Sequence, residues 1–174
     1  MGMIQAPNQT PADRLDQMVR RYEKDLLRIC SVYLRDRTAA EDAVQETFLK
    51  AFRNIESFRG ESSEKTWLIR IAINCCRDYR RSAWFRYMDA RIPIDQLPIL
   101  PSAPPSDEHI ALTMAIMKLK PKYLEAVLLY FYEGYPIKTI AKMLNLTEGA
   151  VSSRIHKAKQ KLKDELEGGE DDEK

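Results

Sequence analysis

The residues best suited to binding chemistry lie near the C-terminal end, in a stretch that is basic, polar and almost free of acidic side chains. From Pro136 to Lys163 the only acidic residue is Glu148. Apolar residues recur every three or four positions after Thr147, which predicts a helix with one buried face. Its other face carries Ser152, Ser153, Arg154, His156, Lys157, Lys159, Lys161 and Lys163. Because Lys and Arg attract phosphates and short polar side chains reach base edges, this surface favours DNA binding over ordinary solvation.

The segment before this helix has the chemistry of a helix-turn-helix. Pro136 suits the first position of a helix, because no amide hydrogen is needed there. Asn145 tolerates the left-handed conformation of a sharp turn, and Thr147 can cap the second helix. Both helices have an apolar face, formed by Ile137, Ile140, Ala141 and Leu144, and by Val151, Ile155, Ala158 and Leu162. A major groove admits one such helix, so the second is the expected recognition helix.

Helical periodicity also dominates the remainder of the chain, which predicts an all-α protein. Helices are expected at about 12–34, 38–54 and 65–81, with Thr38 and Glu41 forming a capping box. Phe48 and Phe52 are expected in the core, while Trp67 fits either a core or a DNA-binding position. Five prolines between residues 91 and 107 rule out a regular element and predict an extended linker. Beyond it, helices are expected from Ser106, with Ile110, Met114 and Met117 inward, and from Pro121 to Gly134, where 123–132 should form the core.

Composition narrows the functional class. The 174 residues carry a net charge of only +2, so any basic surface must be local. We find no signal peptide and no apolar run long enough for a bilayer, and we expect a cytoplasmic protein without membrane insertion. Cys30, Cys75 and Cys76 have the spacing of neither a disulfide framework nor a zinc site, and we expect buried thiols. The two histidines, His109 and His156, do not pair by spacing with a nucleophile. We therefore expect no enzymatic activity, metal or cofactor.

Several segments of the N-terminal half resemble the promoter-melting domain of bacterial sigma factors. These are residues 41–52 (EDAVQETFLKAF), 58–60 (FRG), 66–74 (TWLIRIAIN) and 78–81 (DYRR). Together with the Pro-rich linker and the segment 149–155 (GAVSSRI), they resemble the extracytoplasmic-function (ECF) group of the sigma-70 family. The resemblance implies a region 2 like domain at 12–90, a linker at 91–107, a region 4 like domain at 108–167 and a flexible acidic tail at 168–174. It also implies an alternative sigma factor, which directs core RNA polymerase to promoters.

The resemblance further implies a role for individual residues. Asp42, Gln45, Glu46 and Leu49 would contact the β′ clamp helices of core RNA polymerase, and the β flap is a second expected contact. Recognition and melting of the −10 element would use Phe58, Arg59, Ser62, Ser63, Lys65, Arg70, Asn74, Arg77, Arg80 and Arg81. Recognition of the −35 element would use Lys138, Ser152, Ser153, Arg154, His156 and Lys157. Within the last set, Arg154 and Lys138 are expected at phosphates. An anti-sigma factor is an additional expected partner.

Two other classes of protein remain compatible with parts of the sequence. A stand-alone helix-turn-helix repressor or activator would use the same recognition helix without polymerase. An adaptor would bind protein partners without DNA. The predicted docking helix and −10 segments argue against the former, and the basic recognition helix argues against the latter.

Overall fold

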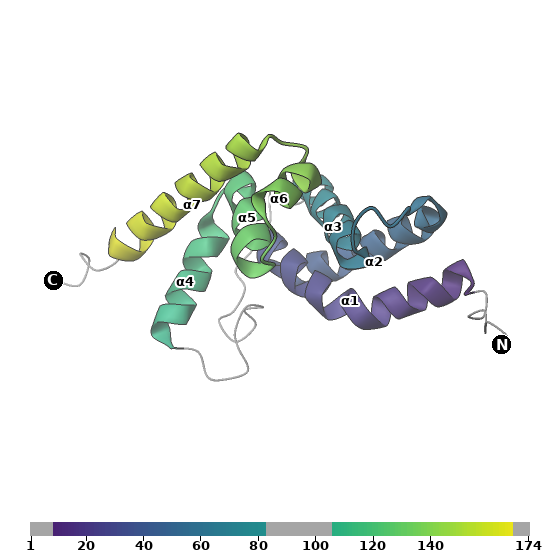
Figure 1. The fold of residues 1–174 in the computed structure, drawn as a ribbon. Coiled ribbons are helices and arrows are strands. Elements are labelled where there is room, and N and C mark those ends of the chain that lie inside the picture. Colours follow the sequence, from purple (N-terminus) through teal and green to yellow (C-terminus); the bar gives the residue numbers. More distant parts are fainter. Residues whose placement is uncertain (1–8, 83–105, 169–174) are drawn as a thin grey trace. The chain divides into compact units, whose positions relative to one another are not determined.

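The computed structural model describes residues 9–82 and 106–168, and every regular element in these two ranges is a helix or helical turn (Figure 1). The chain divides into two compact units, Met1–Asp89 and Ala90–Lys174. This confirms the predicted all-α fold with two helical domains. Most of the predicted linker, 91–107, lies outside the described residues. Its last two positions are described: Ser106 caps α4, and Asp107 is the first residue of that helix.

The first unit contains three long helices, α1 (Pro11–Leu34), α2 (Arg37–Arg53) and α3 (Glu64–Arg81). Each of the three packs against the other two. A short 3₁₀ turn, η1 (Ile55–Ser57), follows α2. The fully buried side chains at the centre include Met18, Leu26, Ile29, Tyr33, Leu34, Leu68, Ile69 and Ile73. This core fixes the directions in which the outer faces of α2 and α3 point.

The boundary between α1 and α2 differs from the predicted capping box. Arg35 adopts a left-handed conformation, with φ at 58°, and ends α1. Asp36 then caps α2, and its carboxylate accepts a hydrogen bond of 2.6 Å from the Ala39 amide. The prediction of a Thr38–Glu41 box was therefore wrong, because the helix begins before Thr38. Glu41 instead pairs with Arg37, at 3.0 Å.

Phe52 was wrongly predicted to lie in the core, whereas Phe48 was correctly placed there. Phe48 is 8% exposed and Phe52 is 43% exposed. A row of residues spaced by four drifts around a helix that has 3.6 residues per turn. After the buried Ala40, Val44 and Phe48, the next member of the row has rotated by about 120° from the first. Ala51 takes its place against the core, and Phe52 points outward.

The second unit contains α4 (Asp107–Lys118), α5 (Pro121–Val127), the π-helical turn η4 (Leu128–Tyr132), α6 (Ile137–Leu144) and α7 (Glu148–Gly168). The helix α7 packs against α4, α5 and α6. All of 123–129 is buried, as expected, but Phe131, within the predicted core segment 123–132, is 50% exposed. Met114 is also exposed, contrary to prediction. The row that α4 buries contains Thr113 and Met117, and Met114 lies about 100° around the helix from Thr113.

The predicted helix-turn-helix is formed by α6 and α7. Pro136 was expected to be the first residue of α6, but it is the N-cap, and the helix begins one residue later, at Ile137. Asn145 has the left-handed conformation that was predicted, with φ at 55°. The Thr147 hydroxyl accepts a hydrogen bond of 3.1 Å from the Ala150 amide, which confirms the cap. At its other end α7 includes Gly168, the first residue of the predicted flexible tail; the rest of that tail lies outside the described residues.

All three cysteines are buried free thiols, as predicted. Burial raises the pKa of Cys75, although Thr47 and Lys50 act in the opposite direction. Within residues 9–82 and 106–168, we find no group of His, Cys, Asp or Glu side chains arranged to hold a metal ion. In those same ranges, the helices are too short or too polar to cross a membrane.

Candidate nucleic-acid interface

The exposed face of α7 carries most of the residues predicted to bind the −35 element. Val151, Ile155 and Ala158 are buried and fix the rotation of the helix about its axis. The exposed residues are Ser152, Ser153, His156 and Lys157 on α7, together with Lys138 on α6. Two small hydroxyls, one imidazole and two ammonium groups are therefore available for phosphates and base edges.

Arg154 differs from this group. Its Nη1 lies 3.9 Å from Oε2 of Glu125, a residue of α5 that is 3% exposed. The Arg154 side chain is itself only 25% exposed. Arg154 therefore has an internal partner, the buried Glu125 carboxylate, which competes with a DNA phosphate for its guanidinium. The structure therefore places Arg154 differently from the four exposed residues of α7.

Two lysines further along α7 lie over aromatic rings. The Lys159 ammonium is 5.2 Å from the centre of the Phe131 ring, and Lys161 is 5.9 Å from the Tyr123 ring. Both distances are in the range of cation–π contacts. Sequence spacing gives no indication of these contacts, because the partners are on different helices.

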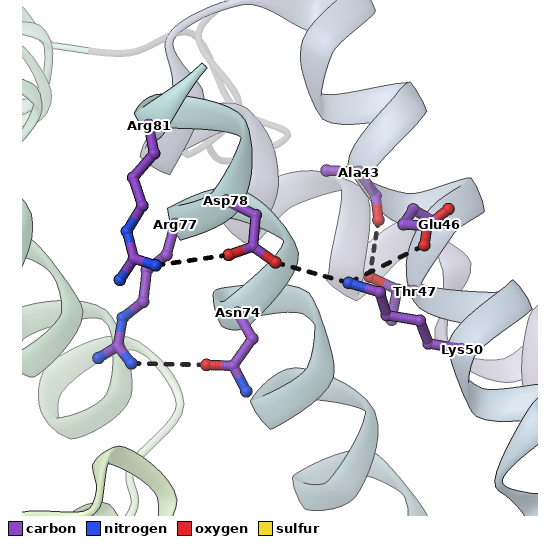
Figure 2. A network of polar contacts seen from close by, with 8 residues as sticks. All are labelled: Ala43, Glu46, Thr47, Lys50, Asn74, Arg77, Asp78 and Arg81. Atoms are coloured by element: carbon purple, nitrogen blue, oxygen red, sulfur yellow. Dashed lines mark hydrogen bonds and ion pairs between the residues drawn. The ribbon is translucent and has the colours of Figure 1, made fainter.

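The helix α3 carries the second group of predicted DNA-binding residues (Figure 2). Asn74 is exposed, as its predicted role in base contact requires, and Arg70 is exposed as well. The Asn74 side-chain oxygen accepts a hydrogen bond of 3.4 Å from Arg77. Arg80 donates to the backbone carbonyl of Tyr33 at 3.3 Å, and Arg81 lies 3.8 Å from Asp78. Asn74, Arg77, Arg80 and Arg81 thus lie in the C-terminal half of α3, whereas Arg70 lies in its N-terminal half. The three arginines of the C-terminal half already have protein partners.

The predicted base-binding loop precedes α3. Arg59 and Ser62 are exposed, whereas Phe58 is half-buried and stacks on Trp67 with ring centres 4.8 Å apart. The Ser63 hydroxyl caps α3 by accepting a hydrogen bond of 3.1 Å from the Thr66 amide. The sequence left open whether Trp67 lies in the core or at a DNA-binding position. Its contact with Phe58 places it beside the loop.

Sequence reasoning missed the residues that hold this loop from α1. Arg14 contacts Glu64 and Phe58, and Asp25 lies 3.1 Å from Lys65. The members of the Arg14–Glu64 pair are 50 residues apart, so no local pattern relates them. The available signal was limited to the opposite charges of a predicted helix, which carries Arg14 and Asp25, and of the segment at the start of the next predicted helix, which carries Glu64 and Lys65.

The outer face of α2 carries the predicted polymerase-binding residues. Asp42, Gln45 and Leu49 are exposed, and Glu46 is half-buried. Beside them, a groove of about 550 Å³ between α2 and α3 is lined by Asp42, Ala43, Glu46, Lys50, Cys75, Asp78, Tyr79 and Ser82. Burial, together with the nearby carboxylates of Asp42 and Asp36, raises the pKa of Tyr79.

Lys50 connects the two helices that line this groove (Figure 2). Its ammonium lies 3.9 Å from Glu46 on α2 and 3.6 Å from Asp78 on α3. Partial burial opposes the charge on Lys50, but Cys75, Asp78 and Glu46 outweigh burial and raise its pKa. The face predicted for polymerase and the helix predicted for DNA are therefore joined by ion pairs.

A helical unit that contains a helix-turn-helix with an exposed basic face has the architecture of a DNA-binding protein. A family model described as Sigma-70 region 2 matches residues 18–86, and one described as Sigma-70, region 4 matches residues 109–162. The ECF RNA polymerase sigma factor SigM of Mycobacterium tuberculosis is 32% identical over 148 residues, which cover 84% of this chain and 74% of that protein. SigW of Bacillus subtilis is 29% identical over 168 residues, which cover 88% and 89%. The chain belongs to the ECF group of the sigma-70 family, and it functions as a sigma factor in promoter-specific transcription initiation.

Two solved structures are similar in fold. CnrH, in a complex with the cytosolic domain of CnrY, has a TM-score of 0.64 and 25% sequence identity, with 88% of each chain covered. The sigma factor RpoE of Bartonella quintana, in a complex with the anti-sigma factor NepR, has a TM-score of 0.71 and 22% identity. That match covers 88% of this chain and 97% of the other. The latter similarity supports the fold alone.

Proposed function

We propose that this sigma factor docks on core RNA polymerase through the outer face of α2, recognises and melts the −10 element with α3 and the loop before it, and binds the −35 element with α7. The observation that carries the proposal is the location of Asn74. This amide is exposed on α3, the helix packed against α2, so polymerase docking and base contact occupy neighbouring helices of one unit.

The docking surface consists of Asp42, Gln45, Glu46, Leu49 and Phe52. The last two are large apolar side chains that are 51% and 43% exposed. Exposed apolar residues next to acidic ones are typical of a surface that receives another helix. The polymerase's β′ clamp helices are the proposed occupant, with the β flap as a second contact of the sigma factor.

Melting by this protein needs no ATP in the proposed mechanism. A flipped base of the non-template strand would be held by the loop at 58–65, where Arg59 and Ser62 are exposed. Arg70, Arg77, Arg80 and Arg81 would hold the backbone, which compensates for an unstacking cost of a few kcal/mol per base. On the duplex, Ser152, Ser153, His156 and Lys157 would enter the major groove, with Lys138 at a phosphate.

The proposal extends to regulation and compartment. CnrH was solved in a complex with the cytosolic domain of CnrY, and the Bartonella RpoE was solved in a complex with the anti-sigma factor NepR. An anti-sigma factor that covers the α2 face is the corresponding partner proposed here. Promoter DNA and polymerase are cytoplasmic, and we therefore place the activity there.

The test is binding of the purified protein to core RNA polymerase, followed by transcription from a genomic promoter library. Tight binding with initiation at a small set of promoters is expected. Absence of polymerase binding, combined with specific duplex binding by the protein alone, would instead support a stand-alone helix-turn-helix regulator.

A further inference from the structure

The N-terminal half of α1 contacts the first residue of α3 and the loop that precedes that helix. Arg14 donates through Nε and Nη2 to Oε1 of Glu64, at 3.2 and 3.1 Å. The two side chains are 34% and 28% exposed, so the pair is partly shielded from water. The guanidinium carbon of Arg14 also lies 5.2 Å from the centre of the Phe58 ring.

These contacts hold both ends of the loop formed by residues 59–63. Phe58 precedes the exposed residues 59–63, and Glu64 follows them as the first residue of α3. Phe58 also stacks on Trp67, one turn into that helix. One guanidinium therefore contacts the residue at each end of the loop, and a second ion pair between α1 and α3, Asp25–Lys65, reinforces the connection.

The loop itself has few internal contacts that could fix its shape. Residues 59–62 are exposed, and Gly60 has a φ of 72°, a conformation that glycine adopts without a steric penalty. Such a segment samples many conformations unless its ends are held. Recognition of a flipped base needs one defined conformation, because binding to a mobile loop loses the free energy of ordering it.

We propose that Arg14 is a positioning residue for −10 recognition, which holds Phe58 and Glu64 so that the intervening loop is pre-organised for the flipped base. The inference rests on the proposed function of that loop. It also gives Phe58 a different role from the one expected: its ring supports the loop through Trp67 and Arg14, and Arg59 and Ser62 are left to face the DNA.

The first experiment compares Arg14→Met with the wild type. Methionine retains an apolar stem but removes the charge from both contacts. Trypsin cleavage after Arg59, quantified by mass spectrometry, measures opening of the loop in the free protein. Loss of a half-shielded ion pair and a cation–π contact predicts cleavage faster by about fivefold to thirtyfold. Arg20→Met is the matched control, since Arg20 lies on the same helix in an exposed pair with Asp16.

The second experiment uses the complete holoenzyme and a single-stranded −10 oligonucleotide. Arg14→Met should weaken oligonucleotide binding by a similar factor and reduce the preference for the correct bases, while affinity for core polymerase stays within about twofold. The charge-reversed pair Arg14→Glu with Glu64→Arg should recover part of both losses, which a general defect in folding would not allow.

The outcomes separate this inference from the proposed function. Wild-type protection of Arg59 in Arg14→Met would overturn the inference, and so would faster cleavage without any change in −10 binding. A wild-type protein that fails to bind polymerase would remove the proposed function itself, and the positioning role with it.

Discussion

At the scale of single residues, Asn74 and Arg77 contact each other in the free protein. The Asn74 oxygen accepts from Arg77, while its amide group is on the exposed face of α3. We expect Asn74→Ala to reduce open-complex formation by about fivefold to 150-fold, because an Asn contact to a base contributes about 1–3 kcal/mol of discrimination. Permanganate footprinting of the melted region would measure this, and polymerase affinity should be nearly unchanged. An equal loss in both measurements would contradict the role of Asn74.

Lys157 and Arg154 lie three residues apart on α7 but have different surroundings. Lys157→Ala should lower the salt dependence of −35 duplex binding by about one unit of slope, because one phosphate contact is lost. Arg154→Met should leave the slope unchanged and destabilise the unit by about 2 kcal/mol, since Glu125 would lose a charged partner. Binding isotherms over a range of salt concentrations and urea unfolding distinguish the two effects. A smaller slope for Arg154→Met would mean that its guanidinium moves to the DNA.

Asp25 should make part of the stability depend on pH. Partial burial opposes its charge, but Lys65 and then Arg28 outweigh burial and lower the pKa of Asp25. A carboxylate with a lowered pKa stabilises the fold above its unfolded pKa of about 3.9, and this contribution is lost as the pH falls through the folded value. Asp25→Asn should therefore lower the free energy of unfolding at pH 6 and have little effect near pH 2.5. Urea titrations at the two pH values measure this, with Asp16→Asn as an exposed control. If Asp25→Asn lowered the free energy of unfolding equally at both pH values, the ion pairs with Lys65 and Arg28 would be excluded as the cause of the loss.

At the scale of the element, α2 carries two phenylalanines one turn apart that lie on different faces. Phe48 lies on the face packed against the core, and Phe52 lies on the proposed docking face. Phe52→Ala should weaken polymerase binding by about tenfold, as expected for a large apolar side chain in an interface, and should leave stability almost unchanged. Phe48→Ala should instead destabilise the unit by about 3 kcal/mol or more, because it leaves a cavity in the core. Polymerase affinity and thermal unfolding of the two variants test the assignment. Unimpaired binding by Phe52→Ala would remove that residue from the docking surface.

The helices could be predicted from the sequence because apolar spacing and local caps determine them within a few residues. Ser106, Asn145 and Thr147 have the predicted conformations or hydrogen bonds for this reason. The errors arose where several choices were locally equivalent. Thr38 and Asp36 both belong to residue types that cap helices well. Phe52 follows Phe48 by four residues, which is also the spacing expected between two residues that face the core. Which of them faces the core depends on how α2 is rotated against α1 and α3, and that information is not local.

The candidate site was less predictable than the fold. The exposure of Asn74 and of the small residues on α7 followed from helical position. Contacts between distant segments did not, including the one between Arg14 and Phe58 and the one between Arg154 and Glu125. A charged residue predicted for DNA by its position in a motif can thus have a partner on another helix, as Arg154 does.

At the scale of the whole molecule, three of the cations predicted for DNA, Lys65, Arg81 and Arg154, are paired with carboxylates among the described residues. Lys65 lies 3.1 Å from Asp25, and Asp78 lies near both Lys50 and Arg81. Asp78→Asn should therefore raise the affinity of the free protein for non-specific DNA by about twofold to fivefold at low salt, and less at high salt. Fluorescence anisotropy with a random duplex measures this. An unchanged affinity would show that the Asp78 pairs do not compete with phosphates.

The same ion pairs affect how long the free protein stays on non-specific DNA. A genome offers millions of non-specific sites, so a protein with fully available cations spends most of its life on the wrong sequences. We expect the carboxylates that accompany Lys65 and Arg81 to shorten each such residence. The free sigma factor would then spend less of its time on non-specific DNA before it meets polymerase.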